Sequence, residues 1–94
     1  NKLFKRTGQI KITFENHDRY TILDVQSPDR LGFLYNVTKK MNELGLIIYF
    51  ARISTKGDDI VDSFYVLDRN GNKVSQNDYQ FIISELTDTI TQIL

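Results

Sequence analysis

The 94-residue sequence contains no cysteine, a single proline, a single histidine and no excess of charge of either sign. Without cysteine there is no disulfide framework, no thiolate-bound zinc and no cysteine nucleophile. The 12 basic and 12 acidic side chains give a formal net charge of +0, so no nucleic-acid or membrane partner is expected. No apolar run approaches the roughly 20 residues that span a bilayer, and no signal peptide is visible, so we expect a cytoplasmic protein. Because the chain opens on Asn1 rather than Met, we also expect a piece of a longer protein.

No residue pattern points to catalysis, to a metal or to a cofactor. His17 falls in a polar turn, where an exposed turn residue is a commoner interpretation than a metal ligand or a base. Asp58, Asp59 and Asp62, and the turn at residues 68–72, lack the spacing and the final Glu of a calcium loop. A phosphate-binding Gly-rich loop and a Gly-x-Ser-x-Gly motif are also missing. We therefore expect a chain that is not itself an enzyme and that binds no cofactor or metal.

The charges are unevenly distributed along the chain. Lys2, Lys5, Arg6 and Lys11 all precede the first acidic residue. We interpret residues 1–8 as a basic linker and residues 9–94 as one domain, since chains of this length form a single core. A basic arm for phosphate or acidic partners is the alternative, although so few charges give only weak, salt-sensitive binding.

Hydrophobic periodicity predicts four strands and two helices. Apolar and polar residues alternate in residues 9–14 and again in 20–26, and the short connection favours an antiparallel hairpin. A 3.6-residue stripe from Leu34 to Leu44 predicts a helix that Asp29 caps and Gly45 ends. Residues 46–55 and 60–68 are rich in β-branched and aromatic residues and are predicted strands. Ser75 and Asp78 resemble a capping pair for a last helix. Its apolar face comprises Tyr79, Ile82, Ile83, Leu86, Ile90 and Ile93.

The resulting element order is ββαββα. From the second strand onward the order is βαββα, which is a ferredoxin-like unit that lacks its final strand. That final strand is normally an edge strand of the sheet, and the first strand of this chain can take the same position. The sequence therefore predicts an α+β two-layer sandwich, with a four-stranded antiparallel sheet and both helices on one face. On the other face, strand alternation places Tyr20, Ile22, Tyr65 and Leu67. Such an apolar group on an otherwise uncovered face favours a partner surface, with scattered surface residues as the alternative.

Residues 29–34 (Asp-Arg-Leu-Gly-Phe-Leu) join a strand to a helix and contain an unusual glycine. Gly32 in the first helical turn lets a backbone, a ligand or a neighbouring chain approach closely. The free N–H groups of that turn favour a carboxylate. From these residues alone, a binding loop and a tight structural turn are equally well supported.

Three segments resemble an ACT domain, over nearly the whole of residues 10–94. They are residues 29–34, residues 51–57 (Ala-Arg-Ile-Ser-Thr-Lys-Gly) and residues 62–68 (Asp-Ser-Phe-Tyr-Val-Leu-Asp), with Gly45 thirteen residues after Gly32. The subtype is similar to the ACT domains of bacterial PII-protein uridylyltransferases, which typically read Asp-Arg-Pro-Gly-Leu-Leu, Ala-x-Ile-x-Thr-x-Gly and Asp-x-Phe-Tyr-Val. Free-standing multi-ACT proteins share these signatures.

This resemblance implies a regulatory domain in the permuted ferredoxin-like ACT fold. ACT domains generally pair, as homodimers or within one chain, and bind small amino acids at the pair interface. In the uridylyltransferase family the ligand is glutamine, and the controlled enzyme is a nucleotidyltransferase of nitrogen metabolism. Carried over by position, the ligand-binding residues would be Ser27, Asp29, Arg30, Leu31, Gly32, Phe33, Leu34 and Ile47.

Two departures from the family pattern leave other functions open. Leu31 replaces the usual Pro and lacks its fixed φ, and Ile47 occupies a place where amino-acid-binding ACT domains often have Asn. A ligand-free structural dimerisation module of a multi-ACT protein is therefore the alternative. RNA binding on a four-stranded sheet is a third hypothesis, with Phe64 and Tyr65 as stacking residues, but the surrounding motif is absent and the net charge is zero.

Overall fold

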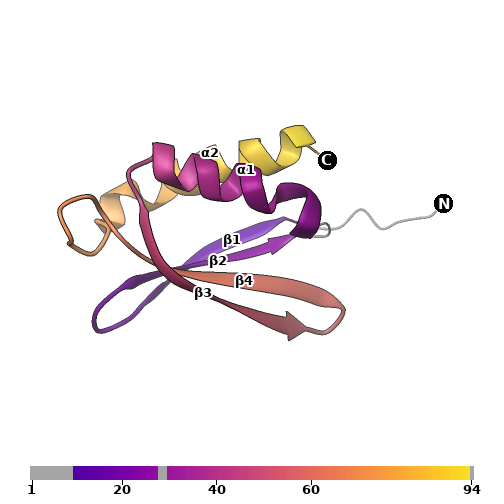
Figure 1. The fold of residues 1–94 in the computed structure, drawn as a ribbon, viewed down its shortest axis with the longest axis horizontal. Helices are drawn as coiled ribbons and strands as arrows, with labels where there is room; N and C mark the ends of the chain where they lie inside the picture. The colour runs from indigo at the N-terminus through magenta and orange to yellow at the C-terminus, as the bar shows by residue number, and fades with distance from the viewer. Residues whose placement is uncertain (1–9, 28–29, 94) are drawn as a thin grey trace.

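The computed structural model describes residues 10–27 and 30–93, which form a four-stranded sheet and two helices (Figure 1). The elements in chain order are β1 (Lys11–Asn16), β2 (Thr21–Ser27), α1 (Arg30–Glu43), β3 (Ile47–Lys56), β4 (Asp59–Leu67), the short 3₁₀ helix η1 (Gln76–Asp78) and α2 (Tyr79–Ile93). This confirms the predicted order ββαββα, with strand ends within two residues of those expected. The expected linker at residues 1–8 lies outside the described residues, as does Asp29, the predicted cap of α1.

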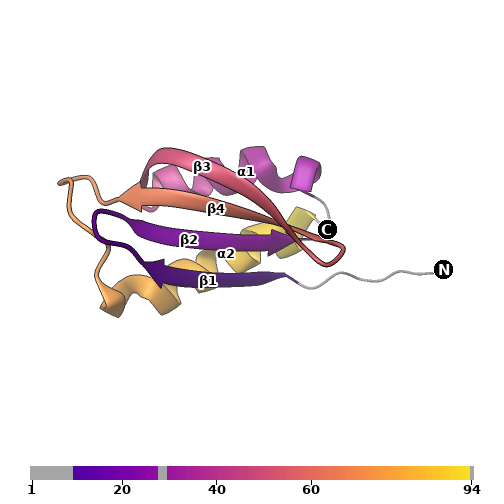
Figure 2. The ribbon, with the colours of Figure 1, turned by 90° about the horizontal axis from the view of Figure 1, so that it is seen from below.

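The sheet is antiparallel and has the strand order β1-β2-β4-β3. β1 pairs with β2, with Ile12 opposite Val25, and so takes the edge position that the missing last strand would occupy. Both helices lie on one face of the sheet, and the opposite face is uncovered (Figures 1 and 2). The α+β two-layer sandwich and the position of the first strand are therefore confirmed.

The hydrophobic core lies between the helices and the sheet. Thr21, Leu23 and Val25 of β2 all face it, as the alternation in the sequence predicted, and each is at most 1% exposed. The other buried apolar residues of the core are Ile12, Phe33, Val37, Met41, Leu46, Phe64, Val66, Val74, Ile82, Leu86 and Ile90. On α2, the predicted apolar face packs against the core as expected. The side chain of Ile93, which was part of that prediction, lies outside the described part of the chain.

Gly45 terminates α1 as predicted, in a left-handed turn just after the last helical residue, Glu43. Gly45 has a φ of 85°, a conformation that a side chain with a β-carbon disfavours. The Leu46 N–H donates to the Met41 carbonyl at 2.9 Å, and the Gly45 N–H donates to the Asn42 carbonyl at 3.0 Å. These two bonds form a Schellman motif, which satisfies the last carbonyls of the helix and aims the chain into β3.

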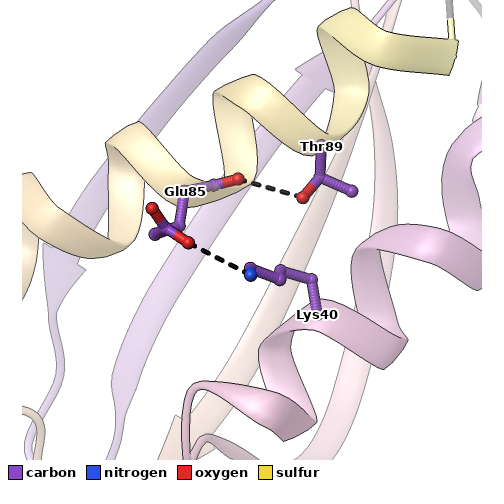
Figure 3. Close-up of polar contacts among 3 residues, drawn as sticks. All are labelled: Lys40, Glu85 and Thr89. Atoms are coloured by element: carbon purple, nitrogen blue, oxygen red, sulfur yellow. Dashed lines mark hydrogen bonds and ion pairs between the residues drawn. The ribbon is translucent and has the colours of Figure 1, made fainter.

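Two polar contacts position α2. The Ser75 hydroxyl accepts from the Asn77 N–H at 3.2 Å and caps η1, which leads directly into α2. Between the helices, Lys40 Nζ lies 3.1 Å from Glu85 Oε1 (Figure 3). Within α2, the Thr89 hydroxyl donates to the Glu85 carbonyl. A half-exposed ion pair of this kind contributes little energy, so the buried faces provide most of the stability of the helix pair.

Candidate functional site

The start of α1 is the site that the sequence predicted for a ligand. β2 ends at Ser27, which is 3% exposed, and α1 begins at Arg30, so the helix N-terminus lies at the end of a central strand. Gly32 lies in the first turn and is exposed. The first N–H groups of a helix lack intrahelical acceptors and carry a partial positive charge, which can hold a carboxylate. Asp29 and the side chain of Arg30 lie outside the described residues.

Residues 31–34 divide between surface and core. The side chain of Leu31 is 85% exposed, whereas that of Phe33 is 1% exposed and belongs to the hydrophobic core. Leu34 is half-buried against the same core. Only Leu31 and Gly32 of these four residues are fully presented to solvent, so Phe33 supports the site from below and its ring is covered.

Ile47 lies far from the start of α1 within one chain. It pairs with Leu67 at the first residue of β3, while Ser27 pairs with Ile60 near the opposite end of the sheet. The structure thus gathers Ser27, Leu31 and Gly32 at one end and leaves Ile47 at the other. A site that contains all of them needs residues from two domains.

Four exposed apolar side chains on α1, β3 and β4 are here called the edge patch. It consists of Leu31 and Tyr35 of α1, Ile53 of β3 and Ile60 of β4, with exposed fractions between 38% and 85%. β3 is an edge strand, and its outer N–H and C=O groups have no neighbouring strand in the sheet. An edge strand beside exposed apolar side chains is a template for pairing with another sheet.

Aromatic side chains gather at one end of the uncovered sheet face. Phe50 and Tyr65 stack with ring centroids 4.4 Å apart, and Tyr20 lies edge-on to both of them. His17 and Tyr49 each pack within 6 Å of Tyr20. The sequence predicted Tyr20 and Tyr65 on this face but missed His17, Tyr49 and Phe50. A register shift between Ile48 and Phe50 breaks the strand alternation and brings two adjacent aromatic residues to the same cluster.

The other end of that face is a polar groove of about 330 Å³. The Ser63 hydroxyl donates to Asp24 Oδ1 at 2.5 Å, and Gln26 Nε2 donates to Asp59 Oδ2 at 2.8 Å. A hydrogen bond with Asp24, and the negative charge of Asp24, raise the pKa of Glu15 above its usual value, while the positive charge of Arg52 lowers it. Charges of both signs therefore line this groove.

The turns that contain Asp68 and His17 were considered above as possible metal-binding sites. The Asp68 carboxylate accepts from the N–H groups of Asn70 and Asn72, which confirms a turn at residues 68–72. His17 Nδ1 likewise accepts from the Arg19 N–H within its turn. Within residues 10–27 and 30–93, no three His, Cys, Asp or Glu side chains group as metal ligands would. No helix in that part of the chain is long and apolar enough to cross a membrane.

Comparison with known proteins identifies the family. The family model described as the ACR family N-terminal ACT domain matches residues 16–92. The chain belongs to the ACT family. This ACT domain is 41% identical over 86 residues to a bifunctional uridylyltransferase/uridylyl-removing enzyme of Cereibacter sphaeroides. The match covers 85% of the chain and 9% of that enzyme. No solved structure is a significant match.

The resemblance inferred from the three segments is therefore confirmed. The chain is a regulatory ACT module related to a uridylyltransferase/uridylyl-removing enzyme. It spans less than a tenth of the length of the relative that it matches.

Proposed function

We propose that this ACT domain senses a small amino acid, with glutamine favoured, and controls a cytoplasmic nucleotidyltransferase of nitrogen metabolism to whose chain it belongs. The relation to a uridylyltransferase/uridylyl-removing enzyme supports the second part of this proposal. The observation that carries the first part is the start of α1, where the exposed Gly32 lies at the positive end of the helix dipole, beside the edge patch. The ligand's α-carboxylate binds at this positive end of the helix.

The site is completed when two ACT domains pair through their β3 edges. In an antiparallel pair of identical strands, the first residue of one strand lies beside the last residue of the other. Ile47 of the second domain then approaches the sheet end that holds Ser27 and the start of α1 of the first. The same pairing covers Ile53 and Tyr35, which are 56% and 72% exposed in the single domain. The partner is a second copy or another ACT domain of the parent chain.

Ile53→Lys is expected to weaken this pairing by roughly ten- to a hundredfold. Burial of an isoleucine side chain contributes about 1.5–3 kcal/mol, and the lysine places a charge in the apolar contact. Sedimentation equilibrium of the isolated chain measures the dimer dissociation constant. The matched control is Phe81→Lys, since Phe81 is 60% exposed but belongs to α2, the helix that packs over β1. Equal effects of the two substitutions, or a wild-type chain that stays monomeric at millimolar concentration, would remove the support for β3 pairing.

Gly32→Ala is expected to weaken glutamine binding at least about tenfold without loss of stability. An added β-carbon in the exposed first turn occupies space where the ligand's carboxylate approaches the helix N-terminus, whereas alanine is a better helix former than glycine by about 1 kcal/mol. Isothermal titration calorimetry with glutamine measures binding, and urea unfolding measures stability. The matched control is Thr38→Ala, in the middle of α1. Unchanged affinity in Gly32→Ala would place the ligand elsewhere.

The second candidate function is a ligand-free pairing module. Two observations favour it: Leu31, which is 85% exposed, adds to the apolar surface for pairing, and Ile47 offers no side-chain hydrogen bond to a ligand. This function predicts a stable pair with no heat of glutamine binding. Calorimetry on a sample shown to be paired separates the two functions.

A further inference from the structure

The middle of the uncovered sheet face carries opposite charges on either side of a small hydroxyl group. Asp24 of β2, Ser63 of β4 and Arg52 of β3 lie in register in one row across the sheet. With neighbouring strands about 4.8 Å apart, the backbones of Asp24 and Arg52 are separated by roughly 10 Å. Asp24, Ser63 and Arg52 all line the groove of about 330 Å³, which has room for a small ligand between the two charged side chains.

The next row toward the aromatic end of the face is apolar. Ile22, Tyr65 and Phe50 lie in register, two residues along each strand from the polar row. Tyr65 and Phe50 stack on each other, and Phe50 is 49% exposed. A stacked pair of aromatic side chains therefore borders the charged row directly.

The charged groups of the polar row have capacity for further bonds. Arg52 is exposed and lines the groove, where its positive charge acts on Glu15 across the sheet. A guanidinium offers five N–H donors in a geometry that matches a carboxylate. Across the groove, Asp24 is half-buried, and its carboxylate and that of Glu15 both line the groove. An ammonium group placed there relieves the repulsion between the two carboxylates.

We propose that this face binds a second free α-amino acid, one with an aromatic or large apolar side chain. The ligand's ammonium lies against Asp24 and Glu15, its carboxylate against Arg52, and its side chain on Tyr65 and Phe50. The ammonium and carboxylate of an α-amino acid are only about 3 Å apart, so each charged side chain reaches inward over Ser63 to meet them. This site lies on the opposite face from the helices, and it does not depend on the glutamine site at the start of α1.

The test is a titration of the ¹⁵N-labelled chain with L-phenylalanine, followed by NMR. The proposal predicts millimolar binding with shifts in β3 and β4, at residues 50–52 and 63–65. Arg52→Ala is expected to weaken binding at least about tenfold, whereas Lys39→Ala, which removes an exposed positive charge on α1, leaves the affinity unchanged. Asp24→Asn retains an acceptor for the Ser63 hydroxyl and is also expected to weaken binding about tenfold.

Two further ligands test whether both charges of the amino acid matter. Phenethylamine lacks the carboxylate and 3-phenylpropionate lacks the ammonium, and each is expected to bind at least about tenfold more weakly than phenylalanine. The proposal is overturned by equal binding of all three ligands, by equal affinity of Arg52→Ala and wild type, or by shifts confined to the start of α1. The proposed glutamine site is tested separately by Gly32→Ala. Either proposal can therefore be contradicted while the other stands.

Discussion

Phe33→Ala is expected to lower the free energy of unfolding by about 3–5 kcal/mol. The Phe33 side chain is 1% exposed and packs into the core between α1 and the sheet, so its removal leaves a cavity that the surrounding residues fill only partly. Domains of this size have a total stability of about 5–15 kcal/mol, so the loss is a large share of it. Urea denaturation followed by far-UV circular dichroism measures the change.

Leu31→Ala is the matched control for this result, two residues away in the same turn. Leu31 is 85% exposed, and surface substitutions usually change stability by no more than about 0.5 kcal/mol. The comparison is made at low protein concentration, because Leu31 belongs to the edge patch. If both variants lose the same stability, or if Phe33→Ala loses less than about 1 kcal/mol, the division of residues 31–34 into surface and core is wrong.

Thr21→Val is expected to cost about 1–3 kcal/mol, the second-largest effect. The Thr21 hydroxyl is buried and accepts a hydrogen bond of 2.9 Å from the Val74 N–H. This bond holds the segment that leads into η1 against β2. Valine has nearly the same shape but no acceptor, so the Val74 N–H is left buried without a partner. The substitution therefore isolates the hydrogen bond from the packing.

Thr21→Ser provides the complementary control, since serine retains the acceptor and removes only a methyl group. Thermal unfolding by calorimetry, together with the exchange rate of the Val74 amide, separates the two contributions. We expect faster exchange of that amide in Thr21→Val than in Thr21→Ser. An equal or greater stability of Thr21→Val would contradict a structural role for this hydrogen bond.

The fold could be predicted from the sequence because its elements carry strong local signals. The alternation in β2, the helical stripe of α2 and the glycine at residue 45 each specify one conformation, and they agree with one another. The hairpin of β1 and β2 follows from the short turn between them. Only one edge of the ferredoxin-like sheet then remains for β1.

The candidate site was less predictable, because it depends on packing and on register. Sequence spacing placed Phe33 with Leu31 and Gly32 in one loop, but the helical turn directs Phe33 into the core. The aromatic cluster was only half foreseen, since the register shift near Tyr49 has no signal in the residue types. The distance between Ile47 and Ser27 follows from the strand order, which tertiary pairing determines.

Hydrogen–deuterium exchange of the chain with and without glutamine tests most directly whether the domain is an amino-acid sensor. One experiment shows both where the ligand binds and whether β3 pairs with a second domain. The proposed function predicts that millimolar glutamine slows exchange at residues 30–34, at the start of α1, and along β3 at residues 47–56. Gly32→Ala is expected to abolish both effects. Unchanged exchange at residues 30–34, in a chain shown to be paired, would contradict an amino-acid sensor and leave a structural pairing module.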